Sequence, residues 1–333
     1  MPRAWIWAGL FALLAVALLL GVAVGAVALP WAQVVAGLVD PAANPIVFKL
    51  RLPRVLGAML VGAALGAAGA AYQGLFRNPL ADPYLMGTAA GAAFGAALGL
   101  DLVGALSPAY AQWIRAGGSW LVPVFAFLGA VGAVFLAVVL AGGVGRTKDL
   151  ILAGVVVGSV LTGLTTYLML KDADRVRAVF AYTLGNLAFI GWPEVVRLAL
   201  YLLLGLPPLF LLARGLNALQ LGEGVAHSLG LALGPLKLVL IVAATLITAG
   251  AVAEAGIIGF VGLVVPHALR RLGGGDYRFL LPASALGGAV LLVFADLLAR
   301  VLVRPAELPV GVVTTILGGP FFLYLLWRMR ARG

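Results

Sequence analysis

The chain has 333 residues, of which 63% are hydrophobic and 10% charged, against the roughly 25% charged residues of an average soluble domain. This composition excludes a soluble globular fold. Cysteine is absent and there are two histidines, which excludes disulfides, thiolate metal sites and a cysteine nucleophile and leaves little for a metal cluster. A net charge of +10 in so apolar a chain first indicates loop charges that orient a membrane protein, and not nucleic-acid binding.

The supply of apolar residues sets the number of membrane spans. A hydrocarbon core of about 30 Å takes about 20 residues per helix, so this chain can form roughly ten transmembrane helices. Glycine accounts for 45 of the 333 residues, which is typical of membrane helices that pack backbone to backbone. We therefore predict an all-α integral membrane protein, a single domain over residues 1–333 with about ten spans and both termini in the cytoplasm.

The first predicted elements follow from runs of apolar residues. The run from Trp5 to Leu29 is too long for a signal-peptide core and lacks a cleavage pattern, so we expect a retained first span. A short amphipathic segment, Trp31 to Val39, then leads to a basic outer loop at 44–54. The second span, about Val55 to Leu75, is rich in small residues that suit close helix crossings. This span ends at Phe76 to Pro83, where two prolines break the helix.

The rest of the chain alternates spans with short loops. A stripe of glycines at every fourth position, from Gly87 to Gly99, predicts a tightly packed interior helix. The apolar stretch 183–190 is too short to cross and predicts a re-entrant or surface helix. Residues 143–149 predict an inner loop, and Pro207-Pro208 a kink. The remaining spans are expected at about 84–100, 119–142, 150–170, 195–213, 236–253, 257–269, 280–299 and 310–327.

Two features of this topology call for a partner. Residues 214–234 are amphipathic without being membrane-like, and their apolar positions fit two short helices broken at Gly222 to Gly224. They form an exposed inner element built to contact something. The topology also places twelve Lys and Arg residues inside and ten outside, so the positive-inside bias is weak and the basic outer face needs another reason.

Several long motifs occur in a fixed order along nearly the whole chain. They resemble those of the iron-chelate and vitamin B12 uptake permeases of the FecCD type, the membrane subunits of type II ABC importers. The stretches that carry this resemblance are Arg51-Leu-Pro-Arg54, Gln73 to Pro83 with Gly87 and Gly91-Ala92, Leu216 to Gly222 with Ser228-Leu-Gly230, Gly259 to His267 with Arg270, and Glu307 to Gly311 with Gly319-Pro-Phe321.

The resemblance implies an assembly in the inner (cytoplasmic) cell membrane. Two permease copies, each of ten helices, would surround a central path, with two ATP-binding subunits beneath and an external substrate-binding protein above. The chain has no Gly-x4-Gly-Lys-Ser/Thr pattern. ATP and Mg²⁺ are therefore expected on a separate ATPase, and this chain is expected to be no enzyme and to bind no cofactor or metal.

Basic residues at the predicted outer face are candidates for docking. Arg51, Arg54 and Arg300 flank the second and ninth spans, and their long stems are compatible with snorkelling to lipid headgroups. In the family, matching arginines pair with acidic side chains of the binding protein, which guanidinium forks suit because they bind carboxylates bidentately. The resemblance thus favours docking for all three.

Two groups of residues are candidates for the cytoplasmic gate. Asn78 and Leu80 lie in the helix break, which by itself predicts only a helix stop and a turn. By resemblance they form part of a gate, with Thr147 and Lys148 of the inner loop near its second layer. Family members often carry small hydroxyl residues where this chain has Lys148, whose charge would repel its counterpart in a second copy.

The amphipathic inner element corresponds by resemblance to the coupling helices that fit a groove on the ATPase. An ordinary pair of surface helices is the alternative. The residues assigned to coupling are Leu216, Asn217, Leu219, Leu221, Gly222, Glu223, His227, Leu229 and Gly230.

Other polar residues have weaker assignments. His227 is expected to make a contact or cap, and His267 to make a structural hydrogen bond. Asp296 has an arginine four residues later on the same helix face, which favours an internal pair. Gln73 is a candidate for lining the path, and Glu254, at the outer end of a span, stays unassigned.

The function expected from these observations is an ATP-driven permease for a bulky chelate such as a ferric siderophore, haem or cobalamin. A secondary, ion-coupled transporter of small solutes is the alternative. That class would use a carboxylate relay near the midplane and would not need an inner docking element.

Overall fold

The computed structural model describes residues 3–25, 27, 29–105, 120–170 and 173–330. Over these residues the secondary structure is helical, which confirms the all-α prediction. The helices are α1 (Arg3–Ala23), α2 (Trp31–Val39), the π-helix η1 (Ile46–Arg51), α3 (Leu52–Leu75), α4 (Thr88–Ala105), α6 (Leu121–Leu140), α7 (Thr147–Met169), α8 (Ala173–Thr183), α9 (Trp192–Leu211), α10 (Ala213–Gln220), α11 (Glu223–Ser228), α12 (Leu233–Ala255), α13 (Val261–Gly273), α14 (Tyr277–Val301) and α15 (Val310–Arg330).

The helices long and apolar enough to cross a membrane number seven among the described residues: α1, η1 with α3, α6, α7, α9, α12 and α14. Shorter apolar segments lie in α4 and α15, at Thr88–Leu102 and Val310–Leu323. The 13-residue α13 occupies the place of the remaining predicted span. The chain is thus a multi-pass membrane protein, and the count of about ten holds only if these three shorter helices are included.

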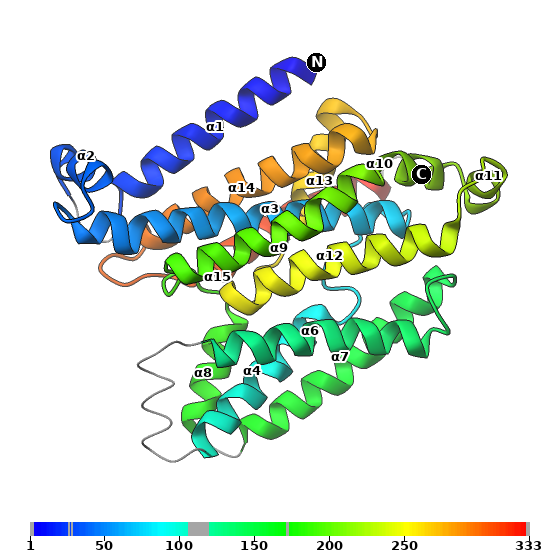
Figure 1. Cartoon of the computed structure of the whole chain (residues 1–333), viewed down its shortest axis with the longest axis horizontal. Coiled ribbons are helices and arrows are strands. Elements are labelled where there is room, and N and C mark those ends of the chain that lie inside the picture. The colour runs from blue at the N-terminus through cyan, green and yellow to red at the C-terminus, as the bar shows by residue number, and fades with distance from the viewer. Residues whose placement is uncertain (1–2, 26, 28, 106–119, 171–172, 331–333) are drawn as a thin grey trace.

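The bundle has two ends that carry different elements (Figure 1). We call one the α2 end; it holds α2, the end of α1 and the turn after α14. We call the other the α11 end; it holds the start of α1, α10 and α11. Helix α3 runs through the middle and is mostly buried, whereas α7 is mostly exposed on its outward side. An exposed apolar side is what a lipid or a second copy would cover.

Glycines allow the central helices to touch. A side chain at Gly62 or Gly66 of α3 would overlap the backbone of α14 at Gly288 or Ser284. In a lipid bilayer the hydrophobic effect does not drive helices together, and the van der Waals contacts made at such close approach stabilise their packing instead. The stripe in α4 works in the same way, since Gly91 faces the backbone of α6. The predicted packing role of these small residues is confirmed.

Some predicted elements were wrong in detail. Residues 184–191 are not a re-entrant or surface helix; the helix α8 precedes them, and they form an irregular segment. The chain leaves the helix at Gly185, whose φ is +68°, and Asn186 N donates to Ala255 O at 2.8 Å. Helix α7 begins at Thr147, inside the predicted loop. Helix α9 continues through Pro207 and Pro208, and the kink expected there stays a prediction.

Candidate functional site

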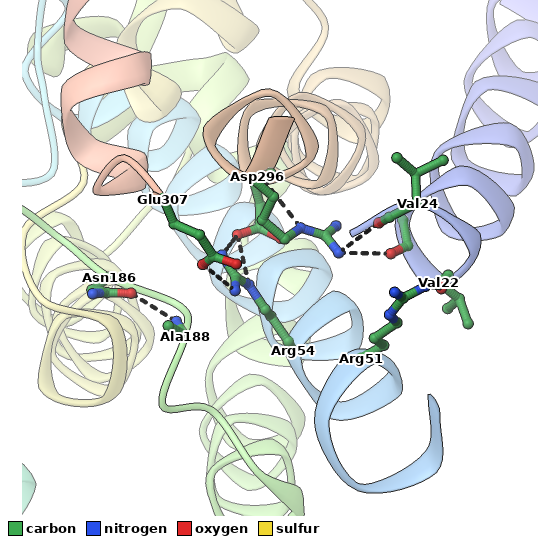
Figure 2. Close-up of polar contacts among 10 residues, drawn as sticks. Val22, Val24, Arg51, Arg54, Asn186, Ala188, Asp296 and Glu307 are labelled. Carbon is green, nitrogen blue, oxygen red and sulfur yellow. Dashed lines mark hydrogen bonds and ion pairs between the residues drawn. The ribbon is translucent and has the colours of Figure 1, made fainter. Parts of the chain in front are cut away.

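Two of the predicted docking arginines lie beneath the surface of the α2 end. Arg51 donates to the carbonyl oxygen of Val22 at 3.1 Å (Figure 2) and to those of Ala23 (2.7 Å) and Val27. Arg300 donates to those of Gly21 (2.8 Å) and Val24 (3.0 Å). The carbonyls of Gly21, Val22 and Ala23 belong to the last turn of α1, where they lack partners within the helix and where the helix dipole also favours a cation. Those of Val24 and Val27 follow the helix. Both arginines therefore fasten the end of α1 to the bundle.

The third arginine completes an ionic cluster. Arg54 Nη2 and Nε lie 2.9 and 3.0 Å from Asp296 Oδ1, and Arg54 Nη1 lies 2.7 Å from Glu307 Oε2 (Figure 2). The other oxygen of Asp296 is 3.0 Å from Arg300 Nε, so the predicted internal pair of these two residues is confirmed. We call Arg51, Arg54, Arg300, Asp296 and Glu307 the arginine cluster. It joins α1, α3, α14 and the turn before α15.

The burial of this cluster bears on docking. Arg51 is 7% exposed and Arg300 is 2% exposed, so in this conformation neither snorkels to a surface nor offers its guanidinium to a partner. Their role in docking remains a prediction, because a partner carboxylate would have to replace contacts that they already make. Exposed cations at the same end are Lys49 and Arg304.

The predicted gate residues lie in two separate segments at the α11 end, one after α3 and one at the start of α7. Helix α3 ends in a Schellman-type cap, with Asn78 N donating to Gln73 O at 3.1 Å and Arg77 at φ +49°. The side chain of Asn78 accepts from Leu80 N at 2.9 Å, which fixes the turn after the helix. Thr147 and Lys148 form the first turn of α7. Their function as a gate remains a prediction.

The predicted coupling residues divide into a buried and an exposed set. Leu216 and Leu219 are buried and anchor α10 on the bundle, whereas Leu221 (65% exposed) and Leu229 (63% exposed) project outward. His227 and Gly230 are also exposed. The exposed leucines form an apolar surface on an otherwise polar element, which is typical of a contact with a partner protein.

Polar contacts hold this element in place. Asn217 Nδ2 donates to Asp276 Oδ1 at 2.7 Å, and its oxygen accepts from Tyr277 N at 2.9 Å. Hydrogen bonds from Arg278 keep the pKa of the Asp276 carboxyl well below its usual value. Between α10 and α11 the predicted break is confirmed at Gly222, whose φ of +108° and ψ of 151° favour glycine.

Some ionic residues were not found from the sequence. Glu254 pairs with Arg197 through two contacts of 2.7 and 2.9 Å, and Glu194 lies 2.8 Å from the same guanidinium. The spacing of Glu194 and Arg197 on one helix was the available signal. Lys237, one of the twelve Lys and Arg residues predicted to lie inside, is buried and lies 2.9 Å from Glu223 Oε2.

The remaining polar predictions differ in outcome. The structural hydrogen bond expected for His267 was wrong: within the described chain, neither ring nitrogen has a hydrogen-bond partner. Gln73 is buried and accepts from Arg270 Nη2 at 3.2 Å, and its place on a path remains a prediction. Among the described residues, no group of three His, Asp or Glu side chains gathers to hold a metal ion.

A groove lies between α4, α7 and the helix break that precedes α4, and it offers room for a transport path. Its volume is about 630 Å³, and its polar lining includes Asp82, Tyr84, Ser159 and Thr162. The two hydroxyls donate to carbonyls of their own helix, Ser159 Oγ to Val155 O at 2.9 Å and Thr162 Oγ1 to Gly158 O at 2.8 Å. They present a weakly polar, uncharged wall along α7.

Fold and site together define a multi-pass transport protein: a helical bundle with an exposed amphipathic element at one end and a basic cluster at the other. The FecCD transport family model matches residues 13–328. The chain therefore belongs to the FecCD transport family, whose members are transport subunits of the ABC permease type and not catalytic enzymes.

Individual relatives are similar to this chain in sequence over most of their length. The chain is 42% identical to the hemin transport system permease protein HmuU of Yersinia pestis, over 85% of this chain and 83% of that one. It is 37% identical to the vitamin B12 import system permease protein BtuC of Klebsiella pneumoniae, over 99% and 96%. A solved structure, an inward-facing conformation of a putative metal-chelate type ABC transporter, is 30% identical with a TM-score of 0.83, covering 96% of this chain and 98% of that chain.

Proposed function

We propose that this chain is the membrane permease subunit of an ATP-driven importer for a bulky metal chelate, such as a ferric siderophore, haem or cobalamin. The match to the FecCD transport family over residues 13–328 carries the proposal. Relatives named for hemin, vitamin B12 and ferric dicitrate fall at 37–42% identity, which supports the chelate class and leaves the individual chelate open.

The exposed element at the α11 end supports an ATPase as the partner. Leu221 and Leu229 project from two short helices that are anchored behind by Leu216 and Leu219. Exposed apolar side chains on an element that is anchored to the bundle by buried leucines are suited to pack into a groove on a soluble subunit. Two such ATPase subunits, each holding ATP and Mg²⁺, would bind a pair of permeases in the inner membrane.

A second copy of the chain is the proposed partner in the membrane. The groove of about 630 Å³ along α4 and α7 opens on the exposed side of α7, so a second copy that faces it would close a shared path. Apolar residues of α7 such as Leu152, Val155 and Val160 are exposed there. Lipid would cover the helices that do not face the second copy.

An external binding protein is proposed to dock on the α2 end and to release the chelate there. The arginine cluster carries three cations and two anions, and exposed Lys49 and Arg304 lie at the same end. A basic surface speeds the encounter with an acidic partner more than it tightens the complex. Because Arg51 and Arg300 are buried, we expect the exposed cations to guide the encounter first.

Co-purification tests the assembly. A tagged permease, expressed with a candidate ATPase subunit from the same organism, should copurify with that ATPase, and a cognate binding protein should stimulate ATP hydrolysis by the complex. Exchanging Lys49 and Arg304 for glutamate should lower this stimulation and make the remainder insensitive to salt. Full stimulation in that variant would refute docking through these exposed cations.

The carboxylates of the membrane-spanning helices give less support to a secondary transporter than to an ATP-driven permease. Asp296 is held between Arg54 and Arg300, and Glu254 is held by Arg197. A carboxylate in a proton-transfer pathway must be able to release its ion-pair partner in order to bind a proton. Asp296 and Glu254 are instead held in ion pairs of 2.7–3.0 Å.

A further inference from the structure

One buried lysine lies between the coupling element and the predicted gate. Lys237, the fifth residue of α12, is 1% exposed, although a solvated lysine would be expected so close to a helix end. Its Nζ lies 2.9 Å from Glu223 Oε2, 3.1 Å from Gly145 O and 3.5 Å from Thr147 Oγ1. An ammonium group has three N–H donors, and these three oxygens are enough to receive them.

These three oxygens belong to different parts of the chain. Glu223 is the first residue of α11, Gly145 lies in the turn before α7, and Thr147 begins α7. Glu223 brings the only full negative charge among them. A buried charge that loses its one counter-ion is strongly destabilised, so α11 and the start of α7 cannot separate freely while Lys237 stays buried.

The same carboxylate reaches the other predicted gate segment. Glu223 Oε1 lies 4.0 Å from Arg77 Nη2. Arg77 occupies the left-handed cap position after α3, with φ +49°, where glycine is the usual residue. This chain has 45 glycines, yet arginine occupies this position, where a residue with a side chain has a conformational cost. We take this to mean that the guanidinium group is needed here for its contact with Glu223.

We propose that Lys237, Glu223 and Arg77 form an ionic link that makes α11 move together with the start of α7 and the end of α3. The link rests on the proposed function, because it gives the coupling element a direct connection to the segments that carry Thr147 and Asn78. Glu223 thus acts as a positioning residue between partner and gate. Its side chain is 36% exposed, so it can follow α11 without being trapped in the core.

The absence of cysteine from the chain allows a direct distance test. Spin labels are attached at Arg146→Cys, before α7, and Ser228→Cys, at the end of α11, both exposed positions. The full-length labelled permease is mixed with an excess of unlabelled permease and reconstituted in nanodiscs, so that the label-to-label distances measured by pulsed electron resonance fall within one copy. With the link intact we expect one narrow distribution.

Removing the link should release the two segments. Lys237→Met and Glu223→Gln should each broaden the distribution at least about twofold, and the double variant should broaden it no further, because both changes break the same Lys237–Glu223 ion pair. The control is Arg214→Met, which removes an exposed cation from α10 and should leave the distribution unchanged. If Lys237→Met does not fold, Glu223→Gln, at a partly exposed site, decides the question. An unchanged distribution in Glu223→Gln refutes the link.

A second arm separates this link from the proposed function. A reference label is placed at Gly9→Cys, and its distance to the label at Arg146→Cys and to the label at Ser228→Cys is measured in the complex with the ATPase. Addition of ATP and vanadate should change both distances together when Glu223 is intact. In Glu223→Gln the two distances should change independently of each other. Concerted shifts that persist in Glu223→Gln refute the link while leaving the importer intact. If the wild-type permease forms no complex with an ATPase, it is the proposed function that fails.

Discussion

The arginine cluster allows one prediction to be worked in detail. In Asp296→Asn the carboxylate that lies 2.9–3.0 Å from both Arg54 and Arg300 loses its charge. The buried Arg300 and the partly buried Arg54 then lose their shared counter-ion. Breaking a buried ion pair on one side costs about 3–5 kcal/mol. At roughly 2 °C of melting temperature per kcal/mol for a chain of this size, the variant should melt about 6–10 °C below the wild type.

The assay is thermal unfolding of the purified permease in a mild detergent, at one fixed scan rate. Glu307→Gln is the matched control, because its side chain is 30% exposed and a pair of that kind contributes about 0–1 kcal/mol. Adding Arg54→Met to Asp296→Asn removes one of the stranded cations and should recover part of the loss. If Asp296→Asn melts together with Glu307→Gln, the cluster does not hold the α2 end together.

Three further predictions use changes at single positions. Gly66→Val would push a side chain into the backbone of α14, costing about 1–3 kcal/mol of overpacking and lowering the melting temperature, whereas Gly9→Val, at an open position, should not. Gly222→Ala, where φ is +108°, should cost about 1–3 kcal/mol of local strain and weaken copurification of the ATPase, with exposed Gly224→Ala as control; equal copurification would contradict the role of the turn. Asp276 has a lowered pKa, so its stabilising contribution is present above its unfolded pKa of about 4 and is lost as the pH falls through the folded value. Asp276→Asn should therefore melt below the wild type at pH 7, with a difference that shrinks below about pH 4.

Features set by local sequence were predictable. The helix Trp31–Val39 has the predicted bounds, and the break at Gly222 follows from the glycines around Glu223. The glycine spacings in α3 and α4 were correctly linked to close packing, because a missing side chain has the same consequence in any helix crossing.

Features set by distant partners were not predictable from a single sequence. Arg54 and Asp296 are 242 residues apart, and no periodicity connects them, so the arginines at the predicted outer face suggested a surface instead of a buried cluster. Lys237 stood at a predicted span boundary, where a solvated cation is the ordinary case. The apolar stretch 184–190 is irregular because its backbone bonds to the end of α12, as in Asn186 N to Ala255 O.

The central claim is that ATP drives a chelate through this permease, and uptake by reconstituted vesicles tests it most directly. The permease and its ATPase are placed in proteoliposomes with ATP inside, and the binding protein is added outside with one of a panel of ferric siderophores, haem and cobalamin. We predict that at least one chelate accumulates, and that accumulation needs ATP, the ATPase and the binding protein together. Accumulation driven by a proton or sodium gradient without ATP would contradict the claim.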